Sequence, residues 1–131
     1  MSLERFGQRS ERSALIRSDG RHIRDYFHVE DGAGAYTTLV EALAKRPELA
    51  GEAFNFSNDL QVFVLNLVRR ILEGTNPTLE PDVRNQVSNE IRHQSLSAAK
   101  GRGVLGWQPL YALDEGINRA NRGTVSFWQH E

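Results

Sequence analysis

The sequence predicts an α/β domain in which short strands alternate with about four helices. Three observations support this prediction: helical stripes of apolar residues recur, short β-prone runs separate them, and turn signals stand between the two. A length of 131 residues fits one domain with a core of its own, and the sequence contains no internal repeat.

The N-terminal residues 1–13 are polar and aperiodic, which predicts a loose arm, and the opening Met1-Ser2-Leu3 has the form of a vector remnant. The predicted domain covers 14–131. Six arginines stand at positions 5, 9, 12, 17, 21 and 24. They either bind a polyanion or are simply exposed to solvent, and both alternatives stay open. The run 14–17 predicts a short strand that the turn signal Ser18-Asp19-Gly20 closes, and a second strand is expected at about 22–28.

A long helix is predicted from residue 29, where apolar residues recur at positions 29, 33, 36, 40 and 43. Glu30 and Asp31 lie in its first turn, where carboxylates suit the positive end of the helix dipole. Lys45 and Arg46 lie in its last turn, and Pro47 prevents continuation.

Three further elements are expected in the middle of the chain. The run 53–57, AFNFS, predicts a compact strand. The run 61–72 predicts a helix that is apolar on more than one side, which implies burial between layers. A weak strand is expected at 82–87.

Two helices are predicted near the C-terminus. Ser97 is a suitable cap for a short helix that reaches Leu105 and is stopped by Gly106. A last helix is expected to begin near Leu113, although Ala112 is a poor capping residue.

The composition excludes several classes of protein. A formal net charge of −1 gives no general attraction to nucleic acid or to an anionic membrane. The absence of cysteine excludes disulfides and thiolate metal sites and fits a reducing compartment. No apolar run has the length of a membrane span, and the N-terminus lacks the apolar part of a signal peptide. We therefore expect a cytoplasmic protein that binds neither nucleic acid nor membrane.

Common catalytic patterns are missing from the sequence. Gly32-Ala33-Gly34 lacks a third glycine and falls inside a predicted helix, so close packing explains it better than a dinucleotide loop. Tyr36 has Val40, not lysine, four residues on, and the four histidines lack metal-ligand spacing. Glu30 and Asp31 form a carboxylate pair, but helix-start electrostatics accounts for them. No catalytic residue and no metal site is predicted.

Four segments occur in an order that resembles a known family. Residues 20–31 read GRHIRDYFHVED, 51–58 read GEAFNFSN, 97–109 contain SAAK and LGWQP, and 113–117 read LDEGI. They resemble the patterns R-D-[YW]-[LIF]-x-V-x-D, G-x-x-[FY]-N-[FIVL]-[GS], D-x-S-K-A…L-G-W-x-P and L-x-E-G-[IL]. These patterns belong to extended short-chain dehydrogenases/reductases acting on nucleotide sugars, the NAD-dependent epimerase/dehydratase family. Residues 88–94, SNEIRHQ, most resemble its CDP-glucose 4,6-dehydratase branch.

The resemblance covers about 14–128 and corresponds to the C-terminal third of such an enzyme. It implies a nucleotide-sugar-binding lobe without the N-terminal Rossmann domain. The family's glycine-rich NAD loop, tyrosine–lysine pair and dehydration residues do not occur in this sequence. The expectation is a truncated, sugar-nucleotide dehydratase-like protein with no cofactor of its own, inactive alone; NAD is the cofactor of the full-length family.

The resemblance also implies a substrate contact. In relatives the arginine of the R-D pair reaches the nucleotide diphosphate, and Arg24 matches it; a guanidinium offers phosphate a rigid fork of donors. Asp25 is expected to project to the opposite face of the strand and to anchor the fold. The alternative is that Arg24 only pairs with Asp19, Glu30 or Asp31.

Other site residues follow from the resemblance with alternatives left open. Many relatives place a second phosphate-binding arginine near position 87, where this sequence has Val87. Arg92 and His93 are the candidates to replace it, or they are surface residues. Asn55 is expected beside the substrate or as a backbone brace, and Trp107 as a packing residue.

The expected ligand is a CDP-glucose-like nucleotide sugar. The strand 53–57 and the helix 61–72 lose their neighbours without a Rossmann domain, which predicts a homo-oligomer or docking to a Rossmann half. Two alternatives stay open: a split-enzyme subunit, or a self-associating module without a ligand.

Overall fold

The computed structural model describes residues 14–128, so the predicted arm at 1–13 lies outside the described residues. The elements in chain order are β1 (Ala14–Ile16), β2 (Ile23–Arg24), α2 (Val29–Lys45), the 3-10 helix η1 (Pro47–Leu49), β3 (Val62–Phe63), α3 (Val64–Thr75), β4 (Pro81–Val83), α4 (Ala99–Leu105) and α5 (Leu113–Trp128). Short strands alternating with helices confirm the predicted α/β class. None of the helices described is long and apolar enough to cross a membrane.

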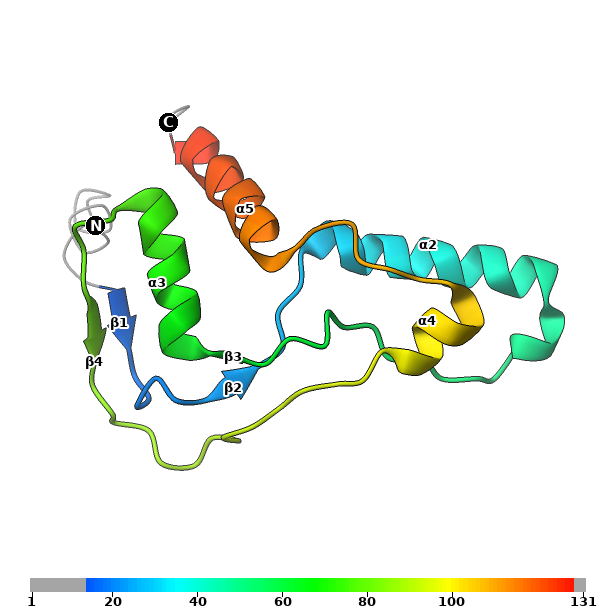
Figure 1. The fold of residues 1–131 in the computed structure, drawn as a ribbon, viewed down its shortest axis with the longest axis horizontal. Helices are drawn as coiled ribbons and strands as arrows, with labels where there is room; N and C mark the ends of the chain where they lie inside the picture. Colours follow the sequence, from blue (N-terminus) through cyan, green and yellow to red (C-terminus); the bar gives the residue numbers. More distant parts are fainter. Residues whose placement is uncertain (1–13, 129–131) are drawn as a thin grey trace, which may run out of the picture.

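The strands form two small sheets (Figure 1). β1 pairs with β4 in parallel, from Ala14 opposite Pro81 to Ile16 opposite Val83. β2 pairs with β3 in antiparallel fashion. The second predicted strand is therefore much shorter than 22–28, and the weak strand expected at 82–87 is found at 81–83.

The molecule is elongated, and its buried cluster lies in the arm formed by α2 and α4 (Figure 1). Helix α2 runs along the long axis and packs against η1 and α4, whereas α3 packs against α5 and β4 at the other end (Figure 1). Ala35, Ala98 and Trp107 form a buried cluster that Phe56 and Leu105 extend. The Phe56 and Trp107 rings meet edge to face with centroids 5.2 Å apart. Trp107 is therefore the packing residue that the sequence predicts.

Helix α2 has the predicted ends, but its predicted apolar stripe does not face the core. The buried residues are Asp31, Ala35 and Ala42. Three members of the stripe are exposed: Val29 (79%), Tyr36 (76%) and Val40 (66%). Small side chains lie on the buried side because α4 and the segment after it cover that side. Hydrophobic periodicity therefore identified the helix, but its apolar stripe is not the side that packs against the core.

Helix α3 begins three residues later than predicted, because Val62 and Phe63 pair with β2 instead. No side chain caps this helix. Its first N–H groups, of Val64 and Leu65, donate to the carbonyls of His22 and Gly20, both at 3.0 Å. Backbone groups distant in sequence satisfy the helix start. None of its residues is fully buried, so the expected burial between layers is wrong.

The strand predicted at 53–57 is absent from the described structure. Phe56 of this segment packs on Trp107, but no neighbouring strand supplies a ladder of hydrogen bonds. A β-strand exists only with such a partner.

The two C-terminal helices lie where predicted. Gly106 ends α4 in the left-handed conformation with φ +67°. The Ser97 hydroxyl accepts from the N–H of Ala99 at a long 3.4 Å, and Asp59 accepts from the N–H of Ala98 at 3.0 Å. Ala98 is the N-cap residue of α4, so the predicted cap by Ser97 is wrong, and Asp59 of a distant loop holds the N–H of Ala98 instead.

Candidate functional site

Arg24, the residue that the sequence assigns to an anion, lies in β2 between two neighbours. Val62 of β3 is opposite Arg24 on one edge, and Ile23 forms a parallel bridge with His93 on the other. The side chain is partly buried, and one guanidinium nitrogen donates to the carbonyl of Ile23 at 2.8 Å. An arginine side chain carries five N–H donors, so most donors of the Arg24 guanidinium stay available to an acceptor.

Arg24 forms no ion pair among the residues described. The three carboxylates that compete for it bind other groups: Asp19 accepts from Arg92 at 2.8 Å, Glu30 from Arg119 at 3.1 Å, and Asp31 from the N–H of Leu110 at 2.6 Å. The pairing alternative for Arg24 is therefore not the observed arrangement.

The loop before α4 brings Arg92 and His93 to β2. The N–H of Ile23 donates to the carbonyl of Arg92 at 2.8 Å. Paired side chains in a sheet share a face and successive ones alternate, so His93 lies on the Ile23 face and Arg24 on the opposite one. The Arg92 guanidinium binds Asp19 at 2.8 Å, yet its side chain is 68% exposed.

His22 is a residue of this region that sequence analysis missed. It is 4% exposed, with ring nitrogens 3.5 Å from a carboxylate oxygen of Asp19 and 3.8 Å from one of Glu90. The backbone N–H of Arg21, followed by the Arg92 guanidinium, holds the pKa of Asp19 below its ordinary value. The only sequence signal for this cluster was the spacing of three between Asp19 and His22.

A polar network fixes the loop beside β2. The buried Ser57 hydroxyl donates to the Asp25 carboxylate and accepts from the N–H of Asp59 at 2.7 Å. Arg102 binds the Asp59 carboxylate, which is the largest cause of a lowered Asp59 pKa. Asp25 thus anchors the fold, as expected. Asn55 is exposed at the start of this loop.

Glu30 joins the start of α2 to the C-terminal part of the chain. Its carboxylate accepts from the Tyr111 hydroxyl at 2.7 Å and from the Arg119 guanidinium at 3.1 Å. These two contacts, Tyr111 first, hold the pKa of Glu30 below its usual 4.5. Asp31 faces a different partner, Leu110. The two carboxylates therefore serve structure and do not form an acid/base pair.

Replacing Glu30 with glutamine should weaken the pH dependence of stability on the acid side. A carboxyl with a lowered native pKa stabilises the fold above its ordinary pKa, and this contribution disappears as the pH falls through the native value, below 4.5. Urea unfolding at about pH 5 and about pH 3 should show a smaller difference for Glu30→Gln than for the native chain. Glu41→Gln, in the same helix, is the control and should keep the native difference. An equal pH dependence of stability in Glu30→Gln and Glu41→Gln contradicts the stabilising role assigned to the Glu30 carboxylate.

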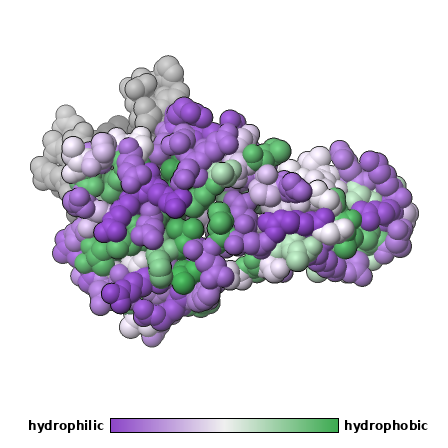
Figure 2. Space-filling view, viewed as in Figure 1, coloured by the Kyte–Doolittle hydropathy of each residue, from purple (hydrophilic) through white to green (hydrophobic). Residues whose placement is uncertain are grey.

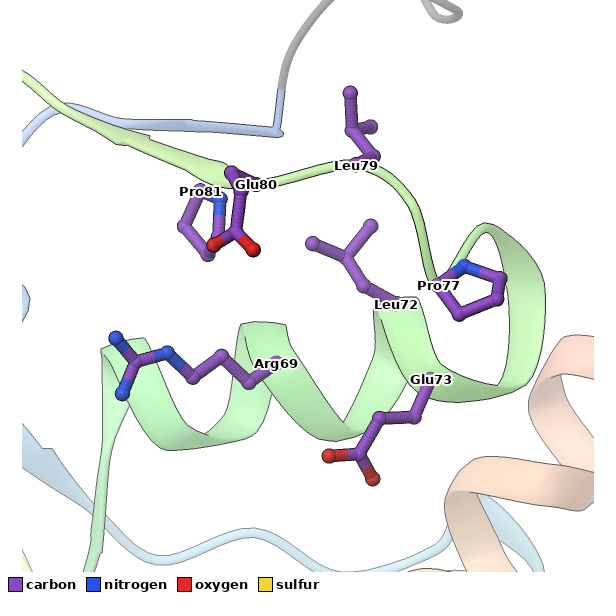
Figure 3. A pocket seen from close by; sticks show the side chains of 7 residues that line it. All are labelled: Arg69, Leu72, Glu73, Pro77, Leu79, Glu80 and Pro81. Carbon is purple, nitrogen blue, oxygen red and sulfur yellow. The ribbon is translucent and has the colours of Figure 1, made fainter.

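A hollow of about 200 Å³ lies between α3 and the segment that leads into β4 (Figure 3). Leu72 points from the helix toward Glu80 and Pro81, whereas Glu73 points to the other side of the helix. The remaining lining residues are Arg69, Pro77 and Leu79. This hollow contains none of the sequence-predicted site residues.

The glycine pair of α2 is not arranged as a dinucleotide loop. Gly32 and Gly34 lie inside α2, and not in a turn between a strand and a helix where N–H groups meet pyrophosphate. Within residues 14–128, no three histidine, aspartate or glutamate side chains gather closely enough to hold a metal ion.

The chain is similar to curated proteins over about a third of their length. It is 30% identical over 120 residues to UDP-glucose 4-epimerase of Mycolicibacterium smegmatis, which covers 92% of this chain and 36% of that protein. It is 29% identical over 118 residues to dTDP-glucose 4,6-dehydratase of Haemophilus influenzae, with 79% and 33% covered. No family model matches the chain.

Solved structures share the fold. UDP-glucuronic acid 4-epimerase from Bacillus cereus, in complex with UDP-glucuronic acid and NAD, superposes with a TM-score of 0.77 at 16% identity, over 92% of this chain and 37% of that one. dTDP-glucose 4,6-dehydratase from Bacillus anthracis, in complex with NAD, gives 0.71 at 18% identity, over the same shares. The predicted fold is therefore confirmed, because the chain has the fold of about a third of each of these solved structures.

Proposed function

From this similarity to NAD-dependent epimerases and dehydratases of nucleotide sugars, we propose that the chain is the nucleotide-sugar-binding part of a CDP-glucose 4,6-dehydratase-like protein. In this proposal the chain binds the substrate and carries out no step of the lyase reaction, so it is inactive alone. The proposal places it in the cytoplasm. CDP-glucose is proposed because residues 88–94 resemble that branch of the family, while the relatives named above act on UDP and dTDP sugars.

The observation that supports the proposal most directly is that the Arg24 guanidinium has unused hydrogen-bond donors. Its backbone is fixed between two neighbouring segments, and it forms no ion pair among the described residues. A guanidinium that is partly withdrawn from water and holds unused donors suits a diphosphate, which accepts several charge-assisted hydrogen bonds.

Three other residues belong to the proposed site. Arg92 is proposed as the second phosphate contact, because its guanidinium is exposed beside β2 and Asp19 takes only part of its donors. Asn55 is proposed to border the ligand. His93 is proposed for the same role, although the β2 register separates it from Arg24.

Isothermal titration of the native chain with CDP and CDP-glucose tests the proposal. We expect Arg24→Ala to bind CDP-glucose between about 10-fold and about 100-fold more weakly, because a charge-assisted hydrogen bond contributes about 1.5–3 kcal/mol. Parallel titrations with UDP-glucose and dTDP-glucose test the choice of base.

Arg21→Ala is the matched control, since it removes the same charge from an exposed position three residues away. It should leave the affinity nearly unchanged. The assignment of Arg24 is contradicted if the native chain shows no heat of binding. It is also contradicted if Arg24→Ala and Arg21→Ala lose the same affinity.

The exposed stripe of α2 and the unpaired 53–57 segment favour a second function, either as a self-associating module or as a split-enzyme subunit that docks to a Rossmann half. Light scattering at micromolar concentration tests the homo-oligomer. A monomeric mass contradicts self-association.

A further inference from the structure

The segment 92–94, in the loop before α4, lies beside β2 in a fixed register. The N–H of Ile23 donates to the carbonyl of Arg92 at 2.8 Å, and the N–H of Gln94 donates to the carbonyl of Ile23 at 3.1 Å. These two hydrogen bonds are the pattern of a parallel pair in which Ile23 faces His93. The main chain therefore fixes which residues of the two segments stand opposite each other.

The face of β2 that carries Arg24 also carries Gln94 and Arg92. Paired residues of neighbouring segments point to the same side, and successive residues alternate. Gln94 therefore stands opposite Arg24, and Arg92 shares this face two residues earlier. Side-chain contacts agree with the placement. His22, two residues before Arg24, and Arg92 both reach the carboxylate of Asp19, at 3.5 Å and 2.8 Å.

The Arg24 guanidinium lies next to the main chain of Gln94. One of its nitrogens donates to the carbonyl of Ile23 at 2.8 Å, and the same carbonyl accepts from the backbone N–H of Gln94 at 3.1 Å. A single oxygen therefore joins the charged group of β2 to the neighbouring segment. The Gln94 side chain is exposed, so its amide is open to a ligand that contacts the guanidinium.

This region forms an open edge of the molecule. In Figure 1 the yellow-green segment that leads to α4 runs beside β2 along the lower edge. Figure 2 shows hydrophilic residues among apolar ones at this edge. The side chain of Arg92 is 68% exposed, and that of Gln94 is also exposed. A ligand can therefore reach both residues without opening the fold.

Charge along the face is uneven. The carboxylates of Asp19 and Glu90 lie at the end occupied by His22, 3.5 Å and 3.8 Å from its ring. Arg24 forms no ion pair among the residues described. The other end of the face therefore combines an uncompensated positive charge with the amide of Gln94. This combination suits a phosphate group.

We propose that the side-chain amide of Gln94 is a further phosphate contact, which holds one phosphate of the diphosphate together with Arg24. The guanidinium supplies charge-assisted hydrogen bonds, and the amide supplies N–H donors from the opposite side. The inference rests on the proposed function for the identity of the ligand. It adds to that function a residue that sequence analysis does not assign to the site.

Isothermal titration with CDP-glucose and with inorganic pyrophosphate tests the role of Gln94. Gln94→Glu keeps the size of the side chain but replaces its N–H donors with a negative charge. We expect this variant to bind both ligands at least about 10-fold more weakly, because it loses a hydrogen bond to a charged group and adds a like charge. Gln86→Glu makes the same change at an exposed glutamine between β4 and α4, and it should bind like the native chain.

Two further measurements separate a direct contact from a structural effect. The urea midpoint of Gln94→Glu should equal that of the native chain, because the side chain is exposed. In a double-mutant cycle, the losses of pyrophosphate affinity in Arg24→Ala and Gln94→Ala should not be additive, since one phosphate contacts both residues. Additive losses contradict a shared phosphate.

The outcomes distinguish this inference from the proposed function. If Gln94→Glu binds like the native chain while Arg24→Ala binds more weakly, the inference is overturned and the proposed function stands. If the native chain binds pyrophosphate but not CDP-glucose, and Gln94→Glu loses pyrophosphate, the phosphate contact is supported and the nucleotide-sugar function is contradicted. Equal losses in Gln94→Glu and Gln86→Glu overturn the inference, and a native chain that binds neither ligand overturns both proposals.

Discussion

Replacing Trp107 with alanine should lower the free energy of unfolding by about 3–5 kcal/mol, the usual range for a buried aromatic residue. Trp107 is 3% exposed and joins α2, α4 and the 53–57 segment through Ala35, Ala98 and Phe56. Its ring meets the Phe56 ring edge to face at 5.2 Å. Ala35 and Ala98 are too small to fill the cavity left by alanine. Since a whole domain is stable by about 5–15 kcal/mol, this loss removes a large share of the stability.

Urea unfolding followed by far-ultraviolet circular dichroism measures this effect without relying on tryptophan emission. Leu110→Ala is the control, because Leu110 is 72% exposed just beyond the same loop and should change stability by less than about 0.5 kcal/mol. An unchanged midpoint for Trp107→Ala contradicts the central role of this cluster.

Replacing Gly20 with alanine should destabilise the fold by about 2 kcal/mol or more. Gly20 has φ +75°, which disfavours a side chain, and an added Cβ would lie 3.0 Å from the Cβ of Leu65. The same residue also holds α3, since its carbonyl accepts from the N–H of Leu65 at 3.0 Å. A shift at this turn therefore disturbs the start of the helix.

Gly34→Ala is the matched control, with the opposite expected sign. Gly34 lies inside α2, and an added Cβ would meet nothing within 4 Å. Alanine should stabilise this helix by about 0.5–1 kcal/mol relative to glycine. Thermal or urea unfolding of the two variants compares them directly, and destabilisation of similar size in both contradicts the structural account of Gly20.

Local chemistry made several elements predictable from the sequence. The ends of α2 follow from Glu30 and Asp31 at one terminus and Pro47 at the other, and Gly106 ends α4 because it adopts a left-handed conformation. The turn at Gly20 was also predictable. These signals act within a few residues, so they do not require knowledge of the rest of the fold.

The candidate site was only partly predictable. The R-D pair identified Arg24 by resemblance, and strand alternation placed Asp25 on the anchoring side, where Ser57 binds it. The competition among carboxylates for Arg24 was not predictable. Its outcome depends on Asp19 meeting Arg92 across 73 residues and Glu30 meeting Arg119 across 89.

By itself, the sequence determined which segments become helices, where most of them end, and which arginine stands at the candidate anion site. Only the tertiary structure decided that α2 turns its apolar stripe outward, that 62–63 pairs with β2 before α3 begins, and that 53–57 forms no ladder. The physical reason is the range of the forces involved. Caps, turns and helix periodicity act between near neighbours in the chain, whereas burial and strand pairing depend on partners that the sequence pattern does not identify.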